Sequence, residues 1–277
     1  MTEPSRGAYG LRLGAPVADE DLVDAPAWWP RWQLGWTKTP VDDRQAQWLG
    51  ADDALLDVQP VGQVLVDRRA STSTLLLPSA PPVEAWPHPY LSATAVLATW
   101  WSGYRSFHAG AFLAVGGAWG ILGDKEQGKT SMLAWLASRE YPVLCDDVLV
   151  IADGRALAGP RCLDLRESAA AHFGLGTYIG RVGGRDRWRA RLPPVPAEVP
   201  FRGWVSLSWA DDVNVSSVKA GERLGKILAR RGLRIPEKGD GNWLDLISRP
   251  MVELGRPMSW SVVDRAMTCL LDALSGL

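Results

Sequence analysis

The chain has 277 residues, a length that suits one large domain or one catalytic domain with an appendage. Lys and Arg number 30 against 31 Asp and Glu, so the formal net charge is −1 and the basic excess typical of nucleic-acid-binding domains is missing. Hydrophobic residues make up 47 % and charged residues 22 %, which excludes a globally disordered chain. We therefore expect a globular protein with no nucleic-acid partner.

The cysteines and the hydropathy pattern indicate the cellular compartment of the protein. Cys145, Cys162 and Cys269 are too few for a disulfide framework, and none sits in the CxxC pair typical of structural zinc. No stretch approaches the roughly 18 apolar residues of a membrane span. Residues 1–22 contain no apolar segment of the secretory type. We expect a cytoplasmic protein that does not bind a membrane.

Residues 1–90 are predicted to form a β-rich N-terminal segment. Short apolar runs at 54–58, 63–66 and 73–77 are separated by turn-forming residues, a pattern typical of strands. The prolines between 81 and 89 indicate a linker-like stretch. A tryptophan cluster is expected to pack the core of this β layer, with a peptide-binding surface as the alternative. The cluster comprises Trp28, Trp29, Trp32, Trp36 and Trp48.

The second segment, residues 91–215, is expected to be the core of the protein. A buried helix is predicted over 91–102, with Ser92 or Thr94 as its cap and Gly103 at its end. Two apolar runs within 111–122 flank Gly116-Gly117, which predicts a β-hairpin whose turn is the glycine pair. A helix follows over 130–140. Residues 143–151 then read as one strand that is interrupted by an Asp-Asp pair.

The remaining elements are predicted from shorter signals. Residues 152–155 (ADGR) indicate a hairpin turn, and strands are expected within 156–165 and at 203–209. Helices over 222–232 and from about 261 onward would complete the fold over 216–277. Ser261 and Asp264 resemble a capping box. The arginines between 181 and 191 either clamp phosphates or an acidic substrate, or form a solvated strand face.

Residues 123–130, GDKEQGKT, match the phosphate-loop pattern G-x-x-x-x-G-K-[ST]. Gly123 and Gly128 allow the backbone to bend so that N–H groups point at phosphate oxygens, and the next helix presents its positive end. Lys129 would contact the β- and γ-phosphates, and the Thr130 hydroxyl would bind Mg²⁺. The loop therefore predicts nucleotide binding, with ATP and Mg²⁺ as cofactors. The expected binding residues are Gly123, Asp124, Lys125, Glu126, Gln127, Gly128, Lys129, Thr130 and Ser131.

Asp146 and Asp147 follow the loop within an apolar strand. Buried carboxylates are costly unless they bind a metal, a proton or a cation. Beside a phosphate loop, one Asp would bind Mg²⁺ and the other would act as general base toward an attacking hydroxyl. The order of these roles is open at this point. The alternative is that the pair ends a strand and one Asp caps a turn.

The segment 107–151 resembles the core of the HPr kinase/phosphorylase family and its shorter relatives, which include kinases encoded beside biosynthetic genes for ribosomal peptides such as lasso peptides. In that family a histidine precedes a hairpin, the hairpin feeds the phosphate loop, and a short helix leads to an Asp-Asp strand. His108, the loop and Asp146-Asp147 occur here in that order. In 159–166, Asp164 and Arg166 resemble the acidic ligand and the arginine of an L-E-I-R motif.

The resemblance implies an α/β phosphate-loop kinase core of the HPr kinase and phosphoenolpyruvate carboxykinase type, with a mixed sheet. It implies ATP- and Mg²⁺-dependent phosphorylation of a serine in a peptide or protein, in ribosomal peptide biosynthesis. Lys129 would bind phosphates, and Thr130, Asp147 and Asp164 would hold the metal. Asp146 or Asp147 would be the base, and His108 would lie near the phosphate end of the nucleotide. Because larger members assemble, a homo-oligomer is also expected.

Two departures keep other functions open. Lys125-Glu126 replaces the Ser-Gly usual in the longer relatives, and their glycine-rich signature after Leu165 is missing. The bulky charged pair would change nucleotide contacts or substrate approach, and the missing signature speaks against HPr as substrate and against the reverse phosphorylase reaction. The alternatives are a kinase of a small hydroxylated metabolite and a nucleotide-binding switch or scaffold without transfer activity. His88 and His172 are expected to be structural.

Overall fold

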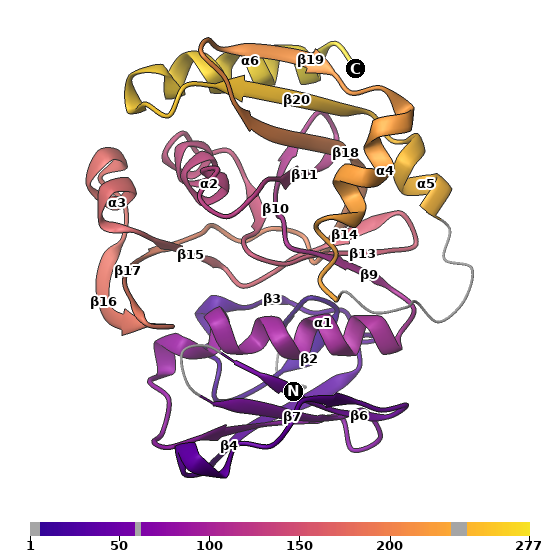
Figure 1. The fold of residues 1–277 in the computed structure, drawn as a ribbon, viewed down its shortest axis with the longest axis vertical. Helices are drawn as coiled ribbons and strands as arrows, with labels where there is room; N and C mark the ends of the chain where they lie inside the picture. Colours follow the sequence, from indigo (N-terminus) through magenta and orange to yellow (C-terminus); the bar gives the residue numbers. More distant parts are fainter. Residues whose placement is uncertain (1–5, 59–61, 234–242) are drawn as a thin grey trace.

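The computed structural model describes residues 6–58, 62–233 and 243–277. Over these residues the chain forms three β-sheets and six α-helices, so the expected mixed α/β architecture is confirmed. The N-terminal sheet lies at one end of the molecule and the C-terminal helix α6 (Val263–Ser275) at the other (Figure 1). In the described part of the chain, no helix is long and apolar enough to cross a membrane.

The N-terminal sheet has eight strands in the order β3-β1-β2-β4-β8-β7-β6-β5. The strands predicted at 54–58, 63–66 and 73–77 are confirmed as β6, β7 and β8. Trp29 and Trp32 are buried as expected, whereas Trp28, Trp36 and Trp48 are exposed. The strand bounds are β1 (Arg6–Ala8), β2 (Leu11–Leu13), β3 (Val23–Asp24), β4 (Arg31–Lys38), β5 (Trp48–Leu49), β6 (Asp53–Asp57), β7 (Gln63–Asp67) and β8 (Thr72–Leu77).

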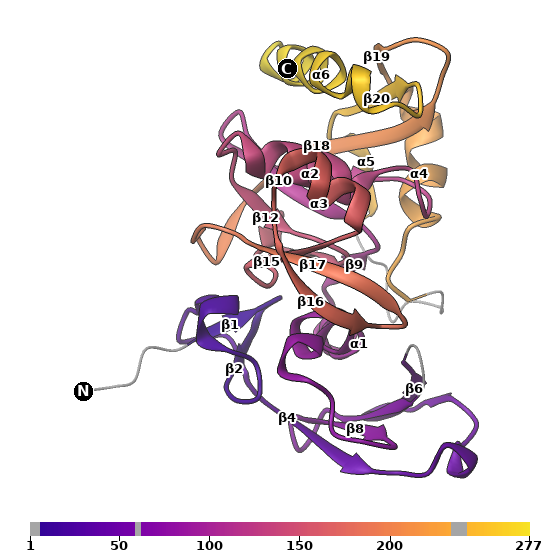
Figure 2. The same ribbon diagram turned by 90° about the vertical axis from the view of Figure 1, so that its left-hand side faces the viewer.

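Helix α1 (Leu91–Trp101) lies between the N-terminal sheet and the rest of the molecule (Figures 1 and 2). The linker predicted around its leading prolines is wrong, because 83–90 forms two tight turns that bury Trp86 and His88. The predicted caps are also wrong. Tyr90, the residue before the helix, is already helical, so the chain continues from turn to helix and no side chain caps α1.

The central sheet contains nine strands, and its parallel part positions the site. β11 pairs in parallel with β18, and β18 pairs in parallel with β20. The carboxyl ends of these three strands therefore meet at one edge of the sheet. The bounds are β9 (Arg105–Phe107), β10 (Gly110–Ala114), β11 (Gly117–Leu122), β12 (Val143–Cys145), β13 (Leu149–Ala152), β14 (Arg155–Leu157), β18 (Glu198–Trp209), β19 (Asn214–Ser217) and β20 (Met251–Arg256).

The predicted β10–β11 hairpin is confirmed, but its turn is displaced by one residue. Ala114 pairs with Gly117, so the two turn residues are Val115 and Gly116, both with positive φ (47° and 74°). Gly117 instead begins β11, where a Cβ atom would lie 2.5 Å from the carbonyl oxygen of Pro200. Its lack of a side chain thus permits close approach of β18. The predicted turn at 152–155 is confirmed, with positive φ at its two central residues.

The interruption predicted at Asp146-Asp147 is confirmed, but residues 143–151 form two separate strands with different partners and not one interrupted strand. β12 pairs with β10, whereas β13 pairs with β9 and β14, so the chain leaves one set of partners for another at the Asp-Asp pair. Asp147 has a φ of 62°, which an extended strand cannot accommodate. The break turns the two carboxylates in different directions.

The central strands are buried on both faces. Ala118 and Leu122 of β11 pack into a core with α1 and the N-terminal sheet, whereas Trp119 and Ile121 pack with helix α2 and α6. This two-sided burial explains why β11 has no alternation of polar residues. The remaining helices are α2 (Lys129–Ser138), α3 (Glu167–Phe173), α4 (Ala220–Leu228) and α5 (Trp243–Ser248).

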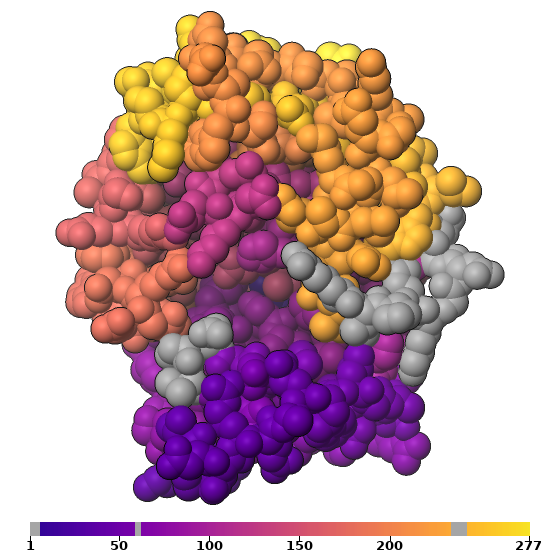
Figure 3. Space-filling model, in the orientation of Figure 1, coloured from indigo at the N-terminus to yellow at the C-terminus, as the bar shows by residue number. Residues whose placement is uncertain are grey.

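A third, three-stranded sheet has the order β15-β17-β16, with β15 (Cys162–Leu165), β16 (Thr177–Val182) and β17 (Arg185–Arg191). It lies beside α3, on the side of the molecule that faces the viewer in Figure 2. In the space-filling view, the indigo N-terminal residues and the yellow C-terminal residues occupy opposite ends, with magenta residues in the recess between them (Figure 3).

The later part of the chain differs from the expectation in several ways. Residues 216–277 contribute a central strand, β20, and a short helix, α5, that the sequence analysis did not anticipate. In the preceding segment, β18 is longer than the strand predicted at 203–209. The helix expected over 222–232 ends at Leu228. The predicted capping box is wrong, since α6 begins at Val263 and the Asp264 carboxylate instead accepts hydrogen bonds from Trp135 Nε1 and Arg139 Nη2, both at 2.6 Å.

Candidate active site

The phosphate loop connects β11 to α2 at the sheet edge where the parallel strands end. Gly128 has a φ of 81°, and a Cβ atom there would lie 2.3 Å from Arg256 Nη2, so the position requires glycine. Lys129 Nζ donates to the carbonyl oxygens of Gly123 (2.8 Å) and Asp124 (3.3 Å). The lysine is 8 % exposed, and burial lowers its pKa. The loop thus holds a desolvated cation that an anion would stabilise.

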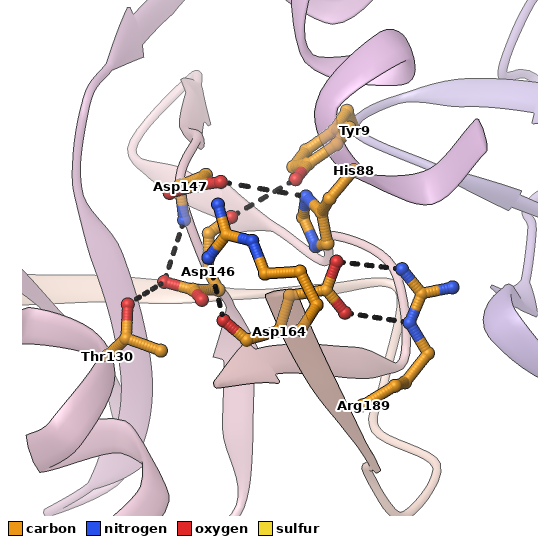
Figure 4. Close-up of polar contacts among 8 residues, drawn as sticks. Tyr9, His88, Thr130, Asp146, Asp147, Asp164 and Arg189 are labelled. Carbon is orange, nitrogen blue, oxygen red and sulfur yellow. Dashed lines mark hydrogen bonds and ion pairs between the residues drawn. The ribbon is translucent and has the colours of Figure 1, made fainter. Parts of the chain in front are cut away.

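The adjacent carboxylates occupy different environments (Figure 4). Asp146 is 4 % exposed, and its Oδ1 accepts from Thr130 Oγ1 (3.3 Å) and from the backbone N–H of Asp147 (2.9 Å). Burial, followed by the charge of Asp147, raises the pKa of Asp146 to about 8. The Asp147 side chain is 46 % exposed and lines a cavity. One carboxylate is therefore buried beside the loop threonine, and its neighbour is accessible.

The cavity has a volume of about 840 Å³ and collects most of the predicted site residues. Gly123, Gln127 and Asp146 do not line it, although each contacts a residue that does. The predicted residues on its walls are His108, Asp124, Lys125, Glu126, Gly128, Lys129, Thr130, Ser131, Asp147 and Asp164.

Asp164 reaches the cavity, but both of its oxygens are engaged. Arg189 Nε donates to Oδ1 at 2.7 Å and Nη2 donates to Oδ2 at 2.8 Å, with both side chains 8 % exposed. Asp21 Oδ2 lies 3.9 Å from Arg189 Nη1. The structure thus assigns Asp164 to a buried ion pair that connects β15, β17 and the N-terminal segment. Its role as a metal ligand stays a prediction from the resemblance.

His108 opens into the cavity. Its backbone N–H donates to the carbonyl oxygen of Arg230 at 2.7 Å. The cavity walls exclude part of its solvent, and this desolvation, followed by the charge of Lys129, lowers the pKa of the imidazole. His108 is therefore neutral near pH 7 and faces the same space as Lys129.

Two residues of the N-terminal segment lie beside the Asp146-Asp147 pair, and the sequence analysis did not assign either of them to the site. The Tyr9 hydroxyl donates to the backbone carbonyl of Asp146 at 3.2 Å. His88, expected to be structural, is 4 % exposed and places Nδ1 3.9 Å from Asp147 Oδ2 (Figure 4). No local signal marks either residue, because tertiary packing brings them to the site.

The ends of β18 and β20 form a wall of the cavity that the sequence analysis did not predict. Trp209 and Arg256 end two parallel strands, and the guanidinium carbon lies 4.7 Å from the centre of the indole ring. Arg256 Nη2 donates to the carbonyl oxygen of Gln127 at 3.2 Å and so ties this wall to the phosphate loop. Recognition of β20 as a parallel strand would have placed Arg256 at this edge.

The loop's own acidic residues are paired with arginines from other elements. Asp124 Oδ1 accepts from Arg230 Nη2 at 2.5 Å, and Glu126 Oε1 accepts from Arg166 Nη2 at 3.0 Å. Lys125-Glu126, the departure from the family pattern, thus places a carboxylate against the arginine that follows β15. The pair spans the cavity from the loop to the third sheet.

The oxygens of Thr130 and Asp146 suit Mg²⁺. A hydroxyl and a carboxylate are hard ligands, and the raised pKa of Asp146 is what a nearby cation would reverse. In the described ranges, no group of three or more His, Cys, Asp and Glu side chains is arranged to hold a metal. Two protein oxygens completed by water and phosphate are typical of magnesium sites.

Comparisons with known proteins add little to this geometry. No protein-family model matches the chain, and no curated protein matches it. Among solved structures, the HPr(Ser) kinase/phosphatase from Coxiella burnetii matches with a TM-score of 0.33 and 14 % identity, covering 62 % of this chain and 97 % of that chain. A likeness at this TM-score carries no argument about the chemistry, so the proposals below rest on the residues of the site.

Proposed function

We propose that the protein is an ATP- and Mg²⁺-dependent kinase that transfers the γ-phosphoryl group to a serine hydroxyl of a peptide or protein. One observation carries the proposal: Lys129 and Thr130, at the start of α2, line a cavity with the Asp147 carboxylate, and Thr130 contacts the buried Asp146 carboxylate behind it. A volume of about 840 Å³ suits a nucleotide together with part of an acceptor. The setting in ribosomal peptide biosynthesis stays a prediction from the resemblance.

The loop would bind the phosphates. The backbone N–H groups at the start of α2 and the Lys129 ammonium, which donates to carbonyls of the loop, would both serve phosphate oxygens. Phosphate oxygens would replace the carbonyls of Gly123 and Asp124 as partners of Nζ. Because the ammonium is already desolvated, its attraction to phosphate is stronger than it would be in water.

Thr130 and Asp146 would hold Mg²⁺, which supplies positive charge to the phosphate oxygens when it is bound. Asp146 fits this role better than Asp147, because its oxygen already contacts the threonine hydroxyl and is closed to an acceptor. This proposal differs from the expectation that Asp147 and Asp164 are ligands.

Asp147 would be the general base. Its carboxylate faces the cavity, whereas that of Asp146 is buried. The serine hydroxyl would give its proton to Asp147 while its oxygen forms a bond to the γ-phosphorus. The bond from that phosphorus to the bridging oxygen would break, and ADP would leave with the electron pair.

The test is transfer from labelled ATP, with Mg²⁺, to a library of peptides with internal and C-terminal serines, followed by mass measurement. A gain of one phosphate, about 80 Da, on a serine peptide is expected. Lys129→Ala should abolish it, whereas Lys38→Ala, an exposed lysine at the end of β4, should not.

Three other outcomes separate the alternatives. Transfer only to small alcohols would identify a small-molecule kinase. ATP binding without transfer to any alcohol would favour a nucleotide-binding switch or scaffold. Absence of ATP binding by the unmodified protein would overturn the proposal.

A further inference from the structure

A row of arginines on β17 leads into the cavity. Arg185, Arg187, Arg189 and Arg191 alternate along the strand, so their side chains lie on one face. Arg189 is paired with Asp164, and Arg191 Nη2 donates to Glu20 Oε1 at 2.8 Å. Arg189 and Arg191 are therefore neutralised by carboxylates, whereas Arg185 and Arg187 line the cavity.

In the part of the chain that the structure describes, Arg185 and Arg187 form no ion pair, although the charge of Arg185 contributes to the lowered pKa of Glu126. Arg185 and Arg187 both line the cavity, and no carboxylate lies within ion-pair distance of either among these residues. The other cavity arginines are engaged: Arg166 with Glu126, and Arg256 with Trp209 and the loop. Two guanidinium groups thus remain available to a ligand.

Arg187 is positioned at the carboxylate end of the cavity. Its Nη1 donates to the backbone carbonyl of Asp164 at 3.2 Å. Arg187 and the proposed base, Asp147, line the same cavity. Arg185, two residues away on the same strand face, also lines it and extends the cationic surface.

We propose that Arg185 and Arg187 form an anion subsite for the acceptor, so that the phosphorylated molecule carries a carboxylate or phosphate group beside its hydroxyl. This inference rests on the proposed kinase function and names its substrate class. Guanidinium groups bind both anions in a bidentate manner. For a serine peptide, the subsite selects an acidic group next to the serine. The subsite holds the acceptor while its hydroxyl faces Asp147, and it exchanges no atoms.

The nucleotide does not require these arginines. Lys129, the α2 N-terminus and the proposed Mg²⁺ ligands already serve its phosphates. The subsite belongs to the third sheet, whereas Trp209 and Arg256 come from the central sheet. Substitution of the subsite should therefore weaken acceptor binding and spare the binding of ATP.

The experiment compares three serine peptides whose neighbouring residues are Asp, Ala or Lys. It adds L-serine as a small hydroxy acid and glycerol 3-phosphate as a phosphorylated alcohol, which distinguishes the sources of the anion. Initial rates are measured with labelled ATP and Mg²⁺. Calorimetric Kd values for each acceptor are measured with and without a non-hydrolysable ATP analogue. The variant is Arg185→Gln/Arg187→Gln, and the matched control is Arg181→Gln, an exposed arginine of β16 that does not line the cavity.

We expect at least one anionic acceptor to bind about tenfold or more tightly than the Ala peptide, with the Lys peptide weakest. The double variant should lose this preference through a higher KM for the anionic acceptor, and its Kd for ATP should not change. The Arg181→Gln control should keep the preference. The identity of the preferred probe tells whether the anion is a side-chain carboxylate, the carboxylate of a small acid or a phosphate.

Two results would overturn the inference: binding of no anionic probe more tightly than the Ala peptide, or a loss of ATP affinity in the double variant equal to its loss of acceptor affinity. Failure of the proposed function is distinguishable from these results. If the unmodified protein bound no ATP, the kinase proposal would fall, while the titrations without nucleotide would still decide whether the subsite binds anions.

Discussion

The N-terminal sheet and the cavity region bury charge very differently. Among the described residues from 6 to 77, Asp21 is the only buried charged side chain, and it faces Arg189 of the third sheet. Beyond residue 120, the described chain buries several more. They are Lys129, Asp146, Arg161, Asp164, Arg189 and Arg256.

The N-terminal sheet is thus stabilised mainly by apolar packing, whereas the cavity region buries charged side chains beyond what packing requires. The N-terminal sheet packs largely through alternating apolar residues, as in β8, where Leu75 and Leu77 point inward. A buried charge is costly unless it is paired or fully hydrogen-bonded. Arg161 meets that condition by donating to the carbonyls of Val143, Leu144 and Pro193. Lys129 and Asp146 meet it only in part, which marks them as groups that await a ligand.

The largest expected effect is that of Asp147→Asn on turnover. The variant removes the proposed base, so kcat should fall by about 10²- to 10⁴-fold. Asn tolerates the positive φ of 62° at this position, so the fold should persist. Single-turnover transfer from labelled ATP and calorimetric ATP binding are the measurements. Full activity with an intact ATP affinity would contradict the assignment of Asp147.

The next largest effect is a difference in stability between variants of two arginines on the same face of β17. Arg189→Ala leaves Asp164 buried without its partner and should lower the free energy of unfolding by about 3–5 kcal/mol. Arg191→Ala removes an ion pair whose side chains are 65 % and 57 % exposed, so the free energy of unfolding of this variant should match that of the unmodified protein. Urea unfolding of both variants checks this. Equal destabilisation would mean that burial does not distinguish the two pairs.

A substitution in the N-terminal sheet should affect stability alone. Leu75 is 2 % exposed and lies on the inner face of β8, so Leu75→Ala should cost about 2–4 kcal/mol through lost burial and a cavity. The specific activity of the folded fraction should not change, because β8 contributes no cavity residue among those described. Thermal unfolding and a rate corrected for folded fraction test this. A changed KM for ATP would show that the two regions are coupled.

The smallest effect concerns pH. The pKa of Asp146 is about 8 in the folded chain against an ordinary 3.8, so the folded state retains a proton that the unfolded state loses. Stability without Mg²⁺ and nucleotide should therefore fall as pH rises from about 4 to about 8. Asp146→Asn should remove this slope and be more stable at pH 8 by about 1 kcal/mol or more. Unfolding curves across this range measure it, and an unchanged slope would contradict it.

Sequence reasoning worked where neighbouring residues carry the signal. The phosphate-loop pattern, the β10–β11 hairpin and the turn after β13 are encoded by contiguous glycines and apolar runs. All three lie where they were expected, apart from a shift of one residue in the turn of the hairpin. It failed where a local pattern was compatible with two partners. Residues 143–151 look like one strand, yet the chain changes partners at Asp146-Asp147. Asp264 looked like a cap, but Trp135 and Arg139 compete for its carboxylate.

The phosphate-loop pattern could be located from the sequence alone, because the spacing of Gly123, Gly128, Lys129 and Thr130 is contained in one short stretch of chain. The tertiary structure sets the environment of each adjacent carboxylate: Asp146 lies beside Thr130, and Asp147 is open to the cavity. It also brought Tyr9 to Asp146 and Arg256 to the loop, across 137 and 129 residues. The physical reason is that burial and partners at the site come from strand order, which no local stretch of residues encodes.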